Sequence, residues 1–204
     1  MIVAGSRKSG KTVFTKHILQ HGKNLIKPAM PKRIMWVYAK HQPDLLEELM
    51  NIDKNIEYVD GIPHDLESTF DRNIMNLIIL DDMMDEASKD ERISQLFTRG
   101  RHDNLSVIYL TQNLFHKNQR NISLNSDYIV VFKNPRDASQ IVNLARQVMP
   151  GNTKFFVWAY RDATKKPFSY LFLDVTPTRD DRFRVSSNIF PHEHPQIMYI
   201  PKGI

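Results

Sequence analysis

Eight residues near the start of the chain have the types and the spacing of a phosphate-binding loop. They satisfy the pattern G-x-x-x-x-G-K-[ST] in full and run Gly5-Ser6-Arg7-Lys8-Ser9-Gly10-Lys11-Thr12. In such a loop the backbone N–H groups surround the phosphates of a nucleotide, and the following helix directs the positive end of its dipole at them. We therefore expect residues 5–12 to bind ATP, with Lys11 reaching the β- and γ-phosphates and the Thr12 hydroxyl binding Mg²⁺.

Two carboxylates at the end of an apolar run form a second candidate site. Asp81 and Asp82 follow the four apolar residues 77–80, a run that is typical of a parallel strand buried on both faces. Ligands bind at the carboxyl ends of the strands in an open α/β sheet. We predict that Asp81 holds Mg²⁺ and that Asp82 polarises the attacking water. Because Asp82 is shorter than the glutamate that many ATPases have there, Asp85 and Glu86 remain alternatives for the base.

Polar and basic side chains follow two further predicted elements. Residues 105–110 predict a buried strand, which ends in Thr111-Gln112-Asn113. Gln112 suits a sensor of the γ-phosphate because an amide donates to a phosphate and accepts from water at once. Arg99 and Arg101, in a basic turn after a predicted helix, suit an arginine finger that acts on the next subunit. By spacing alone, an ordinary polar turn and a helix end whose arginines complement the dipole are equally good interpretations.

The elements that must position these groups alternate between strand and helix. Helical spacing relates Val13, Phe14, Ile18 and Leu19 after the phosphate loop, and the capping-box pattern Ser88-Lys89-Asp90-Glu91 predicts a helix with Ile93, Leu96 and Phe97 on one face. Residues 155–160 fit either a helix or a buried strand. Strands are predicted over residues 2–4, 34–38, 56–59, 76–80, 105–110, 128–132 and 170–175, and helices over residues 44–50 and 138–148.

This alternation predicts an α/β fold, a mostly parallel sheet with helices on both faces. With the phosphate loop, it indicates a P-loop NTPase of the RecA/ASCE-like kind. A length of 204 residues predicts a single ATPase domain over residues 1–204, in which a Pro-, Arg- and His-rich extension from about residue 177 is either packed or mobile. In this extension His192-Glu193-His194 lacks a third ligand at metal spacing, so we expect a solvated tail.

Composition excludes several other classes of protein. Hydrophobic residues make up 41% and charged residues 25% of the chain, which is typical of a folded globular protein. The absence of cysteine excludes disulfides and thiolate metal sites, and no stretch predicts a membrane span or a secretory signal. The net charge of +5 favours an anionic partner without identifying it.

The motifs in combination resemble one superfamily along nearly the whole chain. The succession of residues 77–82, 97–102 and 105–115 is similar to the FtsK/HerA superfamily, and within it to the genome-packaging ATPases of Polinton/Maverick elements, adintoviruses and nucleocytoplasmic large DNA viruses. Asp82 replaces the glutamate more common in the superfamily, although paired acids are usual in this viral branch, and the chain starts only four residues before Gly5. Further matching runs are residues 122–126, 132–137, 145–147 and 163–167.

The resemblance implies a homo-oligomeric ring, a pentamer or a hexamer, that hydrolyses ATP with Mg²⁺ between subunits and pulls double-stranded DNA into a capsid. It implies the capsid or its portal vertex as a partner. It implies Gln112 as the sensor and Arg99 as the finger, with Arg101 as the second choice. It also implies that the protein acts inside the infected host cell, either in the nucleus or at a cytoplasmic assembly site, and that it can be associated with the virion. It implies no membrane partner.

DNA contacts and two other classes of function remain open. Lys117, Arg120 and Arg136 are candidates for sequence-independent contacts with DNA phosphates, and solvated surface charge is an equally good interpretation of them. A small P-loop kinase would use the same loop on a small acceptor. A non-catalytic assembly factor would use ATP only as a structural clip.

Overall fold

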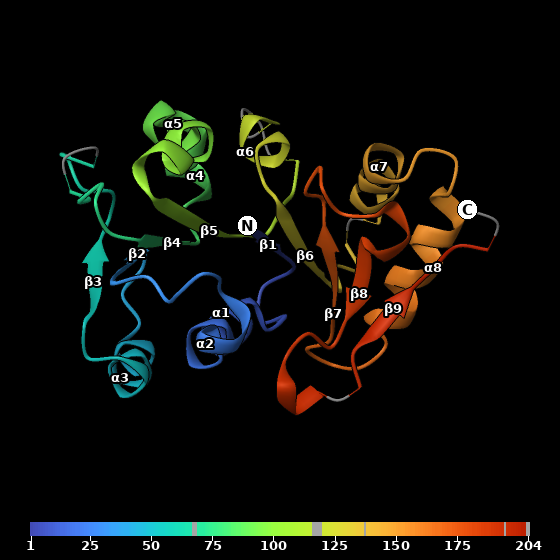
Figure 1. The fold of residues 1–204 in the computed structure, drawn as a ribbon, viewed down its shortest axis with the longest axis horizontal. Helices are drawn as coiled ribbons and strands as arrows, with labels where there is room; N and C mark the ends of the chain where they lie inside the picture. The colour runs from blue at the N-terminus through green and yellow to red at the C-terminus, as the bar shows by residue number, and fades with distance from the viewer. Residues whose placement is uncertain (67–68, 116–119, 137, 194, 203–204) are drawn as a thin grey trace. The chain divides into compact units, whose positions relative to one another are not determined.

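The computed structural model describes residues 1–204 except 67–68, 116–119, 137, 194 and 203–204 (Figure 1). The chain forms two compact units. Unit 1 comprises Met1–Lys11, Gln112–Phe115 and Ser126–Ile204, and unit 2 comprises Thr12–Thr111 and His116–Asn125. The expectation of a single ATPase domain over residues 1–204 stays a prediction.

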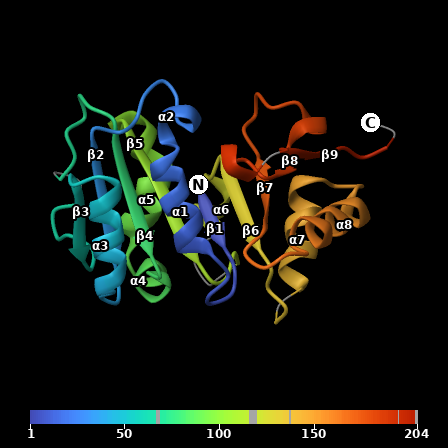
Figure 2. The same ribbon diagram turned by 90° about the horizontal axis from the view of Figure 1, so that it is seen from below.

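Unit 2 is built on parallel strands between helices. β2 pairs with β3 and β4, and β4 pairs with β5, all in parallel, so the strand order is β3-β2-β4-β5. Figures 1 and 2 show α1 and α3 on one face of these strands and α4 and α5 on the other. The elements are α1 (Lys11–Gln20, whose first residue belongs to unit 1), α2 (Gly22–Leu25), β2 (Arg33–Tyr38), α3 (Pro43–Ile52), β3 (Ile56–Asp60), β4 (Asn76–Asp81), α4 (Met84–Lys89), α5 (Glu91–Arg99), the 3₁₀-helix η1 (Gly100–Asp103), β5 (Leu105–Thr111) and α6 (Arg120–Leu124).

The strands of unit 2 follow from their apolar runs. Every residue of β4 is buried, which explains why residues 77–80 are continuously apolar instead of alternating. The predicted strands are present as β2, β3, β4 and β5 with nearly the predicted bounds. The predicted mostly parallel sheet with helices on both faces is confirmed.

The helix predicted after the phosphate loop is present as α1. Phe14, Ile18 and Leu19 of this helix are buried, whereas Val13 is 46% exposed. The predicted capping box is wrong, because Ser88 lies inside α4 and the helix α5 begins at Glu91. Asp90 is the N-cap of α5 instead. Its backbone is extended, and its carboxylate accepts a hydrogen bond from the Arg92 backbone N–H at 3.0 Å.

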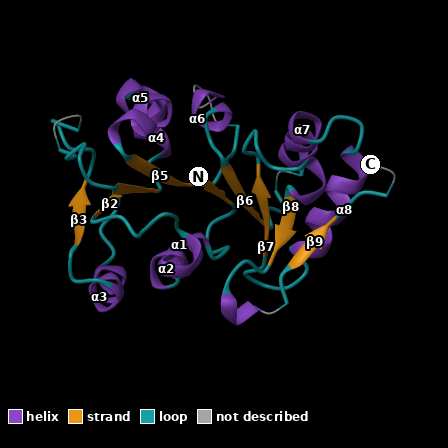
Figure 3. Cartoon of the chain, viewed as in Figure 1, coloured by secondary structure: helices purple, strands orange, loops and turns teal. Residues whose placement is uncertain are grey.

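Unit 1 combines one parallel strand pair with three antiparallel pairs. β1 pairs with β6 in parallel, and β7, β8 and β9 then add to β6 in antiparallel order. Figure 3 shows the helices α7 and α8 beside these strands. The elements are β1 (Ile2–Ala4), β6 (Tyr128–Phe132), α7 (Ser139–Val148), α8 (Thr153–Ala163), β7 (Tyr170–Asp174), η2 (Asp181–Phe183), β8 (Val185–Ser187), η3 (Pro191–Glu193) and β9 (Ile197–Tyr199).

The C-terminal part of unit 1 departs most from the predictions. Residues 155–160, which fitted either element, are helical in α8. Beyond the last predicted strand, β8 and β9 continue the sheet, and each is only three residues long. A strand of that length cannot display an alternating pattern, so its existence depends on the neighbouring strand that pairs with it.

The expectation of a solvated tail is wrong for Glu193. Its carboxylate accepts from the Tyr170 hydroxyl at 2.5 Å and from the Phe190 backbone N–H at 3.2 Å, and the His192 ring stacks on Phe190. Burial, and then the bond to Glu193, raise the pKa of Tyr170 above its usual value. His194 lies outside the described residues. Within the described ranges, no cluster of three or more His, Asp or Glu side chains could hold a metal ion.

Among the helices of the described part of the chain, none combines the length and the apolar character needed to cross a membrane.

Candidate functional site

The backbone of the phosphate loop takes up left-handed conformations at two positions. Lys8 has a φ of 62° and Gly10 a φ of 109°, and the Ser9 backbone N–H donates to the Ser6 carbonyl at 3.2 Å. A φ of 109° favours glycine, which lacks the Cβ that would be strained there. The loop therefore turns sharply between β1 and the start of α1, as the strand, loop and helix order predicts.

Gly5 is confined by a close approach of β6. A Cβ at this position would lie 2.6 Å from Phe132 Cβ and 2.6 Å from Ser9 Oγ, so any larger residue would displace one of them. The Ser6 hydroxyl donates to the Lys133 carbonyl at 3.2 Å, which attaches the loop to the end of β6. These contacts hold the backbone of the loop in place.

Lys11 lies in the curve of the loop. Its Nζ donates to the Gly5 carbonyl at 2.9 Å and to the Ser6 carbonyl at 3.2 Å, so the ammonium is held beside the backbone that would surround phosphates. The Ser9 hydroxyl is buried and has no hydrogen-bond partner among the residues that the structure describes. A cation, a buried hydroxyl and a curved backbone fit the oxygens of a nucleotide polyphosphate.

In unit 2, the two candidate carboxylates occupy different environments. Asp81 is the last residue of β4 and is 5% exposed. Asp82 is exposed and has a φ of 56°, a conformation that Asp tolerates better than most residues with a side chain. Asp81 is in register with Tyr38 of β2 and Leu110 of β5, so the carboxyl ends of three parallel strands lie together, as predicted.

An aromatic pair that the sequence did not single out lies near Asp81. The rings of Tyr38 and Tyr58 stack with centroids 4.2 Å apart. Burial is the largest cause that raises the pKa of Tyr58, a backbone hydrogen bond from Gln42 opposes it, and the charges of Tyr38 and Asp81 add to the rise. The only sequence signal for this pair was the position of Tyr38 at the end of its strand.

The remaining predicted site residues lie at the ends of strands and at the beginnings of helices. Thr12 is half-buried and is the second residue of α1. Gln112 directly follows β5 and is exposed. Asp85 and Glu86, the alternatives for the base, are exposed in the first turn of α4.

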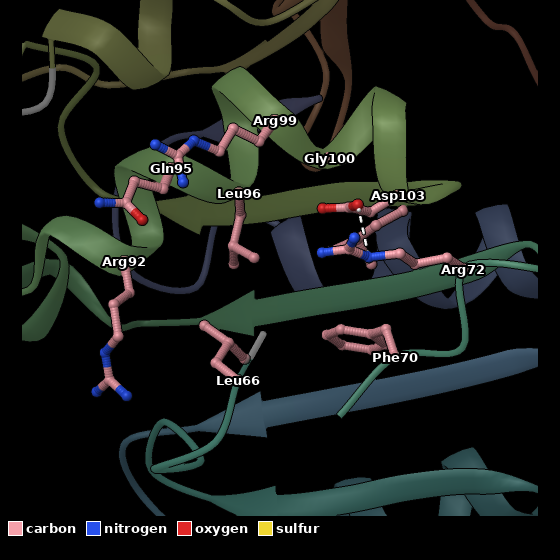
Figure 4. A pocket seen from close by; sticks show the side chains of 10 residues that line it. Leu66, Phe70, Arg72, Arg92, Gln95, Leu96, Arg99, Gly100 and Asp103 are labelled. Carbon is pink, nitrogen blue, oxygen red and sulfur yellow. Dashed lines mark ion pairs between the residues drawn. The ribbon is translucent and has the colours of Figure 1, made fainter. Parts of the chain in front are cut away.

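Arg99 is the last residue of α5 and borders a small pocket in unit 2 (Figure 4). Two other arginines of this pocket have acidic partners, Arg92 with Asp90 at 2.6 Å and Arg72 with Asp103 at 2.9 Å. Among the described residues, no acceptor or ion-pair partner meets the Arg99 guanidinium, and Figure 4 shows it extending away from the Arg72–Asp103 pair. The lining residues are Leu66, Phe70, Arg72, Arg92, Gln95, Leu96, Arg99, Gly100, Asp103 and Leu105.

Several predicted basic residues lie partly or wholly outside what the structure describes. Lys117 falls in the segment 116–119, and only the backbone positions of Arg101 in η1 and Arg120 in α6 are described. Arg136 is exposed in the turn after β6, where its backbone N–H donates to Asn134 Oδ1 at 3.3 Å. The assignment of these residues to DNA or to an arginine finger therefore stays a prediction.

A strand, a glycine-rich phosphate loop and a helix, together with buried parallel strands that end in carboxylates, define a P-loop NTPase. The fold is similar to the cytoplasmic domain of the type VII secretion ATPase EccC from Thermomonospora curvata, with a TM-score of 0.55, 12% identity, and coverage of 98% of this chain but 25% of that chain. It is also similar to a KaiC-like protein from Pyrococcus horikoshii, with a TM-score of 0.48, 14% identity, and coverage of 97% of this chain and 88% of that chain.

Residues 1–149 match the family described as poxvirus A32 protein. The chain belongs to this family of viral packaging ATPases. A comparison with curated proteins found no match. The predicted P-loop NTPase fold is confirmed, and the family agrees with the predicted kind of viral ATPase.

Proposed function

We propose that this chain is an ATP-driven translocase that packages double-stranded viral DNA into a capsid. The observation that carries the proposal is the phosphate loop, in which Lys11 is held beside the carbonyls of Gly5 and Ser6, in a member of a family of viral packaging ATPases. ATP with Mg²⁺, when bound, supplies the phosphoryl group whose transfer to water releases the energy for movement.

The residues of the loop would bind and orient the nucleotide. The backbone of residues 5–12 would donate to phosphate oxygens, and Lys11 would exchange two carbonyl acceptors for phosphate oxygens, which form stronger, charge-assisted hydrogen bonds. Ser9 would gain an acceptor for its buried hydroxyl. Thr12 would act as a metal ligand.

The ends of the parallel strands would supply the metal-binding and proton-handling groups. Asp81 would be a ligand of Mg²⁺, and Asp82 would orient the attacking water and accept its proton, with Asp85 and Glu86 as alternatives. Gln112, exposed directly after β5, would donate to the γ-phosphate.

Arg99 would serve a neighbouring subunit. An arginine finger neutralises charge that develops on the transferred phosphoryl group. A guanidinium without a carboxylate partner reaches that group without first breaking an ion pair. The exposed Arg99 guanidinium, which lacks such a partner among the described side chains, supports this role. Arg101 is the second candidate.

A ring of subunits would grip the duplex through its phosphates. We propose that the chain belongs to the FtsK/HerA superfamily and forms a pentameric or hexameric ring, docked at a capsid or at its portal vertex in the infected cell. Arg136, with Lys117 and Arg120, would contact the DNA without reading its sequence. The net charge of +5 on one chain is multiplied when several copies face one duplex.

Steady-state ATP hydrolysis, measured with and without duplex DNA over a series of salt concentrations, tests the proposal. We expect DNA to stimulate hydrolysis, and we expect the logarithm of the apparent DNA affinity, measured from the stimulation, to fall linearly with the logarithm of the salt concentration. Transfer of phosphate to a nucleoside would instead indicate a small P-loop kinase. Assembly of rings by ATP with no hydrolysis at saturating DNA would indicate an assembly factor.

A further inference from the structure

Phe168 combines an exposed ring with a strained backbone. Its side chain is 69% exposed, and its φ of 62° lies in the left-handed region. A bulky residue with positive φ is an outlier, because its Cβ crowds the backbone. Strained conformations of this kind persist where the surrounding structure holds them, and they cluster at ligand-binding sites.

The segment around Phe168 is held on both sides. The Thr164 hydroxyl donates to the Tyr160 carbonyl at 2.7 Å, which ties the end of α8. The Ser169 hydroxyl donates to the Lys166 carbonyl at 2.7 Å, just before β7 begins at Tyr170. Phe168 is therefore presented by a turn that is fixed between a helix and a strand.

The ring borders the phosphate loop within unit 1. A Cβ built at Gly10 would lie 3.4 Å from both Cβ and Cδ1 of Phe168, and 3.3 Å from Phe132 Cε1. Phe132 is buried and fills the space beneath the loop, whereas Phe168 reaches solvent at its side. One aromatic ring thus supports the loop and another lies open beside it.

Other exposed aromatic side chains of unit 1 have partners. Trp158 packs edge-on against Tyr199, and the guanidinium groups of Arg179 and Arg182 lie over the ring of Phe183. Within the part of the chain that the structure describes, neither an aromatic ring nor a cation stacks on Phe168. Its open face is available to a flat ligand.

We propose that Phe168 is the stacking platform for the base of the bound nucleotide. The inference rests on the proposed function, because it concerns the same nucleotide. A base is joined to its phosphates through one ribose, so an aromatic ring beside the loop lies within its reach. Stacking uses the face that every base has, so Phe168 would add affinity for nucleoside triphosphates in general and would not select adenine.

Calorimetric titration of Phe168→Ala with MgATP and with magnesium tripolyphosphate tests the inference. We expect affinity for MgATP to fall about tenfold, which is within the range of base stacking, and affinity for tripolyphosphate to stay unchanged. Phe168→Trp should restore MgATP binding. Trp158→Ala, which removes another exposed aromatic side chain of unit 1, is the matched control and should bind both ligands as the wild type does.

The two ligands separate failure of this inference from failure of the proposed function. Wild-type affinity of Phe168→Ala for MgATP would overturn the stacking role and leave the proposed function standing. An equal loss for both ligands would also overturn it, since Phe168 would then support the phosphate loop. If the wild-type chain binds neither ligand, the proposed function fails and the inference fails with it.

Discussion

The cation of the phosphate loop and the cation at the end of helix α5 differ in how completely described residues of the chain satisfy them. In the loop, the Ser6 hydroxyl bonds the Lys133 carbonyl and the Lys11 ammonium bonds two carbonyls of the loop itself. At the end of α5, Arg99 is exposed and has no partner among the described residues, although Arg72 and Arg92 beside it are paired. Lys11 is therefore held by acceptors of its own loop, whereas the Arg99 guanidinium meets no partner in the described part of the chain, as our proposal of an arginine finger requires.

This difference has a physical reason. A phosphate-binding loop must present its N–H groups in a fixed arrangement, so contacts that order its backbone reduce the cost of binding. A guanidinium already paired with a carboxylate would have to break that pair before it could reach a phosphate. Four substitutions, from the largest expected effect to the smallest, test the comparison.

Lys11→Ala should reduce ATP hydrolysis to background while the chain remains folded, because the loop loses the cation that reaches the phosphates. Steady-state phosphate release and circular dichroism measure the two outcomes. Lys16→Ala is the matched control, since Lys16 lies on the same helix and pairs with Glu48. Normal turnover by Lys11→Ala would contradict the assignment of the phosphate loop.

Arg99→Ala should lower turnover by roughly 10³-fold or more and leave ATP binding intact, because a finger acts on the charge that develops during transfer. Arg72→Ala, in the same pocket, should change turnover only slightly. Mixing Arg99→Ala subunits with Lys11→Ala subunits should restore part of the activity, because each variant supplies what the other lacks. The absence of any recovery would count against action between subunits.

Gly5→Ala should lower the free energy of unfolding by about 1–3 kcal/mol, since the added Cβ forces Phe132 or Ser9 to move. Denaturant unfolding measures the change. Ser6→Ala is the control in the same loop, because it removes one exposed hydrogen bond and adds no atom. Equal stability of Gly5→Ala and the wild type would show that Phe132 and Ser9 leave room for a Cβ at residue 5.

Asp90→Ala should lower the free energy of unfolding by about 1 kcal/mol, because α5 loses its N-terminal cap. Denaturant unfolding measures the change. The hydrogen bond from Arg92 lowers the pKa of Asp90, so the unfolded chain binds the proton more readily than the folded one. The contribution of the charge is therefore complete above the unfolded pKa and is lost as pH falls through the folded pKa. Asp90→Asn keeps a capping oxygen without the charge, and its deficit relative to the wild type should shrink over that acidic range.

Prediction from the sequence succeeded where the information is local. The buried strands β4 and β5 are recognisable because short, continuous apolar runs are typical of parallel strands that are buried on both faces. The strands β8 and β9 were missed because three residues carry too little pattern, and they form only by pairing with a strand that is already in place. The pattern of residues 88–91 predicts Ser88 as the cap, whereas Asp90 caps the helix, because the sequence alone does not tell where the chain turns.

The sequence by itself determined the P-loop fold and the position of the phosphate loop, since Gly5, Gly10 and Lys11 act through their own spacing along the chain. Only the tertiary structure decided which side chains stand beside that loop and which charges stay unpaired. Phe168 borders Gly10, and Arg72 pairs with Asp103, whereas Arg99 has no partner among the residues that the structure describes. These properties depend on residues brought together by folding, which no local pattern encodes.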